Sequence, residues 1–159
     1  MLDWPEIVLR LGVATLTGCA IGLNRDLQGK SIGLKTMGLV GLSTALVVLL
    51  AMNLAEPVLS DSAGRVIQGI LTGIGFLGAG VIVRERHHFR VRGLTSAACT
   101  FLAACIGIAC GAGHWRAVVT AVVMAFGLLI LGRKLEEFMH RALGGGREPE
   151  EDRRPPPHD

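Results

Sequence analysis

The sequence contains no tyrosine and few aromatic or charged residues. Aromatic residues make up 4% and charged residues 18% of its 159 positions, whereas soluble domains carry about 25% charged residues. The sequence also lacks a P-loop, a dinucleotide-binding glycine fingerprint and a nucleophile grouped with a base. These absences predict that the chain is not an enzyme, uses no cofactor and binds no nucleic acid.

Candidate metal ligands are few and poorly grouped. The four cysteines all lie inside apolar runs: Cys19, Cys99, Cys105 and Cys110. None belongs to a CxxC pair, and we interpret them as small core residues. His87 and His88 are adjacent, so their side chains point apart, and nothing nearby supplies a third ligand. We therefore predict no metal site.

What the sequence does contain is apolar. Half of its residues are hydrophobic, 22 are glycine and the mean hydropathy is +0.50. Five charge-poor runs occur, at about 5–23, 32–52, 64–83, 94–111 and 114–132. Each forms about 27–31 Å of helix, close to the ~30 Å thickness of a bilayer core. We predict an all-α integral membrane protein, with a bundle of five transmembrane helices over residues 1–132.

The basic residues are distributed unevenly between the two sides of this bundle. Of 16 lysines and arginines, 13 fall in the 24–35 loop, in the 84–92 loop or after residue 132. The positive-inside rule then places the N-terminus outside and the C-terminus inside. Trp4 and Trp115 fall at the predicted outer boundary, where tryptophan is favoured.

The chain beyond the fifth run differs in composition. Residues 133–143 can continue the fifth helix into the cytoplasm as a juxtamembrane helix, and three glycines then end it. Residues 144–159 combine mixed charge with three consecutive prolines and almost nothing to bury. We therefore expect a disordered cytoplasmic tail.

Small residues recur at four-residue spacing in every predicted span except the second, which favours close contacts between helices. The third span is the richest, and we identify five helix-packing glycines in it: Gly69, Gly73, Gly75, Gly78 and Gly80. Two interpretations stay open for this span. Either neighbouring helices pack closely against it, or it is locally unwound, as in the broken helices of transporters. The surplus of small-residue faces also leaves room for a homodimer.

Charged residues gather at the predicted inner boundary. Seven cationic residues and two carboxylates lie there, in the 24–35 and 84–92 loops. Because Mg²⁺ prefers carboxylate and water oxygens, this balance favours an anion or an anionic lipid phosphate. Lys35 lies inside the start of the second span, and we expect it to be paired or to face a polar cavity.

Several stretches resemble the membrane domain of the MgtC/SapB family. They are "GLNRD" followed by "GKSIGLKT", then "QGILTGIGFLGAGVIVRE", and then "VRGLTSAA" before a small-residue helix that ends "GIACG". Their order and spacing match the family over about residues 5–132. The chain departs from the family at Asn24, where an acidic residue is common, so a role for two carboxylates there is not carried over. Longer members have a cytoplasmic C-terminal regulatory domain, which we expect this chain to lack.

The resemblance implies a multi-pass protein of the bacterial inner membrane, linked to magnesium limitation, stress or virulence. It also implies action through other membrane proteins, including the ATP synthase and a magnesium-transporting P-type ATPase. The candidate functional cluster combines the family's polar motif positions with the loop charges beside them. Its members are Arg25, Asp26, Lys30, Lys35, Thr36, Gln68, Arg84, Glu85, Arg92, Thr95 and Ser96.

Two functions remain in competition at this point. The leading hypothesis is a regulatory or adaptation protein that acts by binding partner membrane proteins. The alternative is a small-solute or ion transporter or channel, with a site between the glycine-rich third span and the inner charge cluster. The predicted spans carry no Asp or Glu away from their ends, which disfavours transport of a cation.

Overall fold

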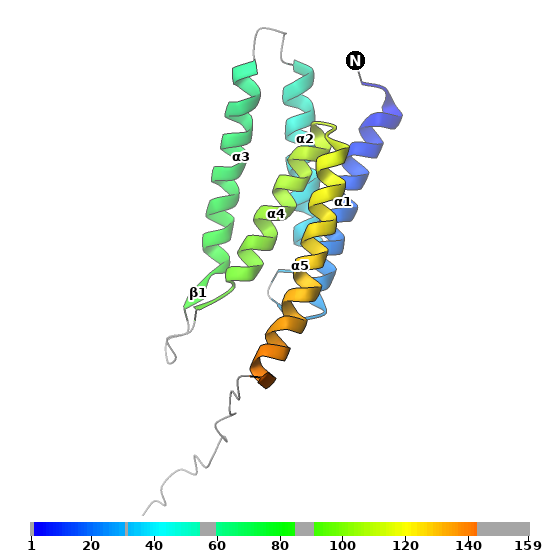
Figure 1. The fold of residues 1–159 in the computed structure, drawn as a ribbon. Coiled ribbons are helices and arrows are strands. Elements are labelled where there is room, and N and C mark those ends of the chain that lie inside the picture. Colours follow the sequence, from blue (N-terminus) through cyan, green and yellow to red (C-terminus); the bar gives the residue numbers. More distant parts are fainter. Residues whose placement is uncertain (1, 31, 55–59, 85–90, 143–159) are drawn as a thin grey trace, which may run out of the picture. The chain divides into compact units, whose positions relative to one another are not determined.

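The computed structural model contains five helices that are long and apolar enough to cross a membrane. It describes residues 2–30, 32–54, 60–84 and 91–142. The helices are α1 (Trp4–Asp26), α2 (Leu34–Leu54), α3 (Ser60–Val81), α4 (Leu94–Gly111) and α5 (Trp115–Ala142) (Figure 1). The predicted five-helix membrane fold is confirmed, while the orientation of its termini stays a prediction.

The chain divides into two compact units, residues 1–124 and residues 125–159. The first unit contains α1 to α4, and α5 crosses the boundary between the units. α5 is a single helix of 28 residues, and it includes residues 133–142, where the sequence predicts a juxtamembrane continuation. The predicted tail at 144–159 lies outside the described residues.

Helices α1 and α2 pack backbone against backbone. A Cβ atom added to Gly18 would collide with the Met37 carbonyl oxygen, and one added to Gly22 would lie 2.6 Å from the Leu34 Cα. Any side chain at either glycine would hold the two helices apart. Close approach of this kind lets small residues drive helix association in a membrane, where lipid is as apolar as the side chains.

Helix α2 lies at the centre of this packing, although we did not count its span among those with repeated small residues. Its small residues Gly38, Gly41 and Ala45 lie at steps of three and four. A Cβ on Gly41 would collide with the Ala14 carbonyl oxygen of α1. On the α4 side, a Cβ on Gly107 would lie 2.6 Å from the Gly41 carbonyl oxygen, and one on Gly111 would lie 2.5 Å from that of Ala45. The small residues of α2 therefore serve two neighbouring helices at once, α1 and α4.

Arg10 joins α1 to the C-terminal end of α4. Its Nε donates to Glu6 Oε1 at 2.8 Å, and its Nη1 donates to the Gly111 carbonyl oxygen at 2.8 Å. The last carbonyls of a helix lack partners within the helix and carry partial negative charge. The guanidinium satisfies one of them, so this contact fixes the register between the two helices.

Helix α3 is continuous over its 22 residues, so the locally unwound form is not observed. It contacts the other helices through one apolar face. Ile74 is buried in a cluster with Val40 of α2 and with Ala103 and Ala104 of α4, and Ile70 packs against this cluster. In Figure 1, α3 lies beside α4 along the first unit.

A short antiparallel ladder, which the sequence did not predict, connects α3 to α4. Its strands are β1 (Val83–Arg84) and β2 (Val91–Arg92), so α3 ends before residue 83 rather than at it. Gly93 follows β2 with a φ of +95°, and a Cβ there would collide with the Val81 carbonyl oxygen. Only glycine fits this position, because it tolerates positive φ and leaves room for the crossing backbone.

Candidate functional site

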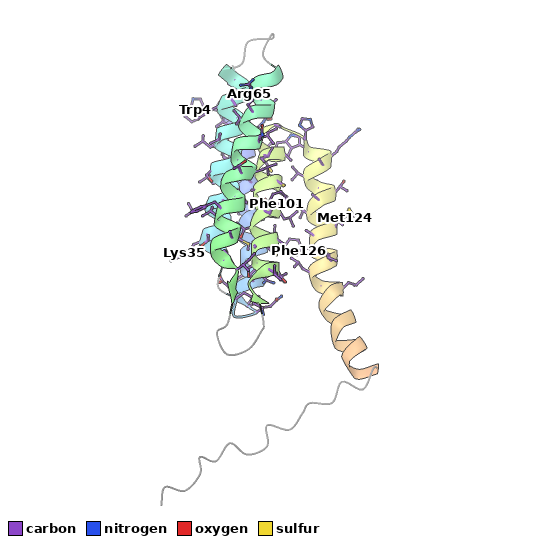
Figure 2. All side chains as sticks on the ribbon, turned by 90° about the vertical axis from the view of Figure 1, so that its left-hand side faces the viewer. Trp4, Lys35, Arg65, Phe101, Met124 and Phe126 are labelled. Atoms are coloured by element: carbon purple, nitrogen blue, oxygen red, sulfur yellow. The ribbon has the colours of Figure 1, made fainter. Side chains whose placement is uncertain are left out.

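Most of the candidate cluster lies at one end of the first unit, which we call the ladder end. Here α1 ends, α2 and α4 begin, and α3 continues into β1. Figure 2 shows Lys35 towards this end and Trp4 and Arg65 near the opposite one. The antiparallel order of α1 to α4 therefore brings the described ends of the two predicted charged loops to the same end of the first unit.

Arg25, in the last turn of α1, is buried, with only 4% of its surface exposed. Its Nη2 donates to Ser96 Oγ at 3.0 Å, and Ser96 is itself 1% exposed in the first turn of α4. Its Nη1 lies 3.4 Å from Gln28 Oε1, a long and weak contact. No group in the described part of the chain accepts a hydrogen bond from its buried Nε, although a guanidinium carries five N–H donors.

Within the described part of the chain, little compensates the charge of Arg25. Among the described residues, no carboxylate forms an ion pair with it. The C-terminus of α1 offers partial negative charge, but Ser96 belongs to the N-terminal turn of α4, where the helix dipole is positive. Removing an unpaired charge from water costs several kcal/mol. An anion bound beside Arg25 and the start of α4 would offset that cost.

The neighbouring carboxylate, Asp26, is committed elsewhere. Its Oδ2 accepts a hydrogen bond from the Leu34 N–H at 2.8 Å. Leu34 is the first residue of α2, and the opening N–H groups of a helix have no acceptor within the helix. A Cβ on Gly33 would collide with the same carboxylate. Asp26 therefore caps α2 from eight residues upstream, and glycine at position 33 leaves room for it.

Replacing Asp26 with alanine is expected to lower the free energy of unfolding by about 1 kcal/mol, the usual effect of losing an N-cap. Asp26→Asn is expected to retain most of this stability, because asparagine caps as well as aspartate. Thermal unfolding in detergent measures both effects, with the exposed Lys30→Ala as control. If the asparagine variant were as unstable as the alanine variant, the negative charge rather than the cap would hold this turn.

Four more polar residues of the cluster are exposed: Lys30 after the end of α1, Lys35 and Thr36 in α2, and Thr95 in α4. Lys35 points outward from the first turn of α2 (Figure 2). Among the described residues no ion pair with Lys35 is formed, and the expectation that it is paired or faces a polar cavity stays a prediction. A lysine at the end of a spanning helix extends its stem along the apolar surface and places its ammonium group in the polar boundary.

The structure does not bring Gln68 to the ladder end. Gln68 is exposed on α3, about 20 Å of helix away from Val81 at 1.5 Å per residue. Arg84 and Arg92 stand in the two paired strands, so their backbones do meet at the ladder end. Glu85 and the histidines predicted to bind no metal lie outside the described residues.

The five predicted packing glycines of α3 have very different surroundings. A Cβ on Gly78 would lie 3.6 Å from the Ala97 Cβ of α4, an ordinary contact. The other four have no described neighbour within 4 Å of such an atom: Gly69, Gly73, Gly75 and Gly80. The packing role of these four stays a prediction that requires a partner.

The sequence reasoning missed two residues of the ladder end. Gln28 Oε1 contacts Arg25 Nη1, and Gln28 donates from Nε2 to Asn24 Oδ1 at 2.9 Å. Gly33 makes room for the Asp26 carboxylate. The position of Gly33 just before a helix start could have indicated that another residue caps α2, because glycine has no side chain that can cap the helix.

Comparison of the sequence with known proteins identifies a family of relatives. The sequence profile of the MgtC family matches residues 11–138. The chain is 32% identical to protein SapB of Bacillus subtilis, over 96% of the chain and 67% of SapB. It is 40% identical to protein MgtC of Salmonella typhimurium, over 84% of the chain and 55% of that protein. It is also 38% identical to protein SrpB of Synechococcus elongatus, over 72% of the chain and 68% of SrpB.

The chain thus spans about half to two thirds of the length of these relatives. No solved structure matches it.

Proposed function

The chain belongs to the MgtC family, a family of membrane proteins, and we propose that it is a regulatory protein of the bacterial inner membrane that acts by binding other membrane proteins. Adaptation to magnesium limitation or stress is the setting that its family implies. In this proposal the ladder end faces the cytoplasm, as the distribution of basic residues requires.

The observation that carries the proposal is an open glycine face on α3. Gly69, Gly73 and Gly80 follow one another at steps of four and seven residues, so they share one side of the helix. None has a described neighbour within 4 Å of an added Cβ. Phe76 lies on the same side and is 80% exposed. A transmembrane helix of a partner can approach this backbone as closely as α1 and α4 approach α2.

The polar side chains within the first unit also favour binding over transport. The buried Thr44 and Thr100 donate their hydroxyl protons to carbonyl oxygens of their own helices, at 2.8 Å and 2.9 Å. On α3, Thr72 does the same with the Gln68 carbonyl oxygen at 2.8 Å. Because these donors are already satisfied, the threonines serve the helix backbone, and they do not offer a chain of free donors to a passing solute.

Copurification from bacterial membranes with two candidates, the ATP synthase and a magnesium-transporting P-type ATPase, tests the proposal. Gly73→Leu is expected to reduce recovery of the true partner by about tenfold, because an added side chain separates the helices. Gly64→Leu is the matched control. It lies on the same helix and also has no described neighbour within 4 Å, but it faces another direction.

Three outcomes would count against the proposal. Equal recovery with both variants would remove the support that the α3 face provides. Loss of self-association in Gly73→Leu, with neither candidate affected, would make a second copy of this chain the occupant of the face. Ion flux into vesicles that contain only this protein would favour the transporter hypothesis over the regulatory one.

A further inference from the structure

We infer that Arg25 and the first turn of α4 form a binding site for a phosphate-bearing anion at the ladder end. The inference concerns a different surface from the α3 glycine face, and it goes beyond the proposed binding of partner proteins. It rests on two independent features that meet at Ser96: a buried guanidinium with an unused donor, and a helix N-terminus without a cap.

The guanidinium is the first feature. Only 4% of the Arg25 surface is exposed, yet its Nε has no acceptor among the residues that the structure describes. Burial of a polar donor is unfavourable unless a hydrogen bond replaces the lost water. Ser96 Oγ accepts from Nη2 only. The site therefore holds a fixed positive charge and at least one donor that the described protein does not use.

The start of α4 is the second feature. α4 is preceded by Gly93, which provides no side-chain hydrogen bond to cap the helix. The opening N–H groups of this 18-residue helix thus depend on an acceptor outside it. A helix N-terminus with free N–H groups and a positive dipole end is a general binding site for phosphate. Arg25 adds a full charge at the same turn, through its hydrogen bond to Ser96.

The chemistry of these donors selects the ligand class. A guanidinium and helix N–H groups can donate to several oxygens of one tetrahedral phosphate at once. A divalent cation is disfavoured, because Asp26, the carboxylate next to Arg25 in the sequence, is engaged by the Leu34 N–H. In addition, no group of three His, Cys, Asp or Glu residues lies together among the described residues. Arg25 also lies in the last turn of a spanning helix, at the depth where lipid phosphates are found.

Gln28 is the side chain that a ligand would displace at the guanidinium. Its side chain is half-buried in the turn after α1, and its 3.4 Å contact with Nη1 is near the limit of a hydrogen bond. Gln28 also has a second partner, Asn24. A phosphate oxygen can replace the weak Gln28 contact and form a charge-assisted hydrogen bond, which is stronger.

The phosphate can belong to an anionic lipid headgroup or to a free anion, and one experiment separates these sources. The delipidated wild-type protein in detergent is titrated with phosphatidylglycerol, with phosphatidylcholine and with inorganic phosphate. Native mass spectrometry counts the bound ligand, and the shift in unfolding temperature measures how much the ligand stabilises the protein. Arg25→Gln is expected to weaken binding of the preferred ligand by at least about tenfold. Lys35→Gln removes an exposed cation at the same end and is expected to change binding by no more than about twofold.

Tight binding of phosphatidylglycerol without competition from inorganic phosphate would assign the site to lipid. Binding of inorganic phosphate alone, lost in Arg25→Gln, would assign it to a free anion. Equal weakening by Arg25→Gln and Lys35→Gln would overturn the inference, since only surface charge would then matter, and so would wild-type affinity in Arg25→Gln.

If Arg25→Gln does not yield a monodisperse protein, Arg25→Lys carries the test. It keeps the charge but lacks the planar fork, so a reduction of about tenfold is again expected. Unchanged affinity in Arg25→Lys would overturn the inference. Because α3 takes no part in the site, either result leaves the test of partner binding at Gly73 unaffected.

Discussion

Replacing Gly107 with leucine is expected to lower the free energy of unfolding by about 3 kcal/mol, the upper end of the usual range for overpacking. A Cβ at this position would lie 2.6 Å from the Gly41 carbonyl oxygen and would also collide with Thr44 Oγ1. Backbone cannot rotate away as a flexible side chain can, so α2 and α4 must separate. Because Gly41 also meets Ala14 of α1, the disturbance extends to all three helices.

The free cysteines provide the measurement. Cys99 and Cys110 are buried in α4, so a thiol-reactive fluorophore reports the temperature at which the helix interface opens. Gly12→Leu is the matched control, since Gly12 on α1 has no described neighbour within 4 Å of an added Cβ. We expect an early transition in Gly107→Leu and near-native behaviour in Gly12→Leu. Equal midpoints for the two variants would mean that the α2–α4 contact contributes little to stability.

The five spans could be predicted from the sequence because length and hydropathy determine them. The fourth is the clearest case: residues 94–111 are both the predicted run and the observed helix α4. The third was predicted to reach residue 83 but ends at Val81, since the backbone of the next residues pairs with β2. Backbone pairing between two such short strands is not visible in a hydropathy window.

The central position of α2 could not be predicted from a four-residue repeat. Small residues at four-residue spacing lie on one face of a helix, and one face can pack against one neighbouring helix. Gly41 instead meets Ala14 on one side and receives Gly107 on the other, and the small residues that do this lie at mixed steps of three and four along α2. A helix with two close neighbours needs a wider small-residue surface than one with a single neighbour.

The candidate site shows the same division between local and tertiary information. Counting the charged residues of the sequence placed Arg25, Lys30 and Lys35 in one boundary cluster. Such a count treats the three side chains alike, because each contributes one positive charge. Packing of α1 against α4 separates them, because it buries Arg25 beside Ser96 and leaves both lysines exposed. The sequence therefore identified the end of the molecule that carries charge, while only the tertiary fold identifies which charge is withdrawn from water.

The Arg25→Met/Ser96→Ala double variant is expected to be as stable as the wild type, or more stable by about 1–4 kcal/mol, when both are delipidated in detergent. The wild type keeps a buried charge with a donor that no described residue uses, and the variant replaces it with apolar atoms. Removing Ser96 Oγ together with its guanidinium partner leaves neither group buried alone, and replacing both partners avoids the cost of an orphaned donor or acceptor.

Addition of a phosphate-bearing ligand is expected to reverse this order. A ligand that binds only the folded protein stabilises it by about 2.7 kcal/mol at a concentration one hundred times its Kd, and only the wild type has the site. Thermal unfolding reported by Cys110, with and without phosphatidylglycerol or inorganic phosphate, measures both halves of the prediction. A double variant that is several kcal/mol less stable without ligand would contradict it. Arg25 would then be a structural residue, and the cost of burying its charge would already be met within the protein.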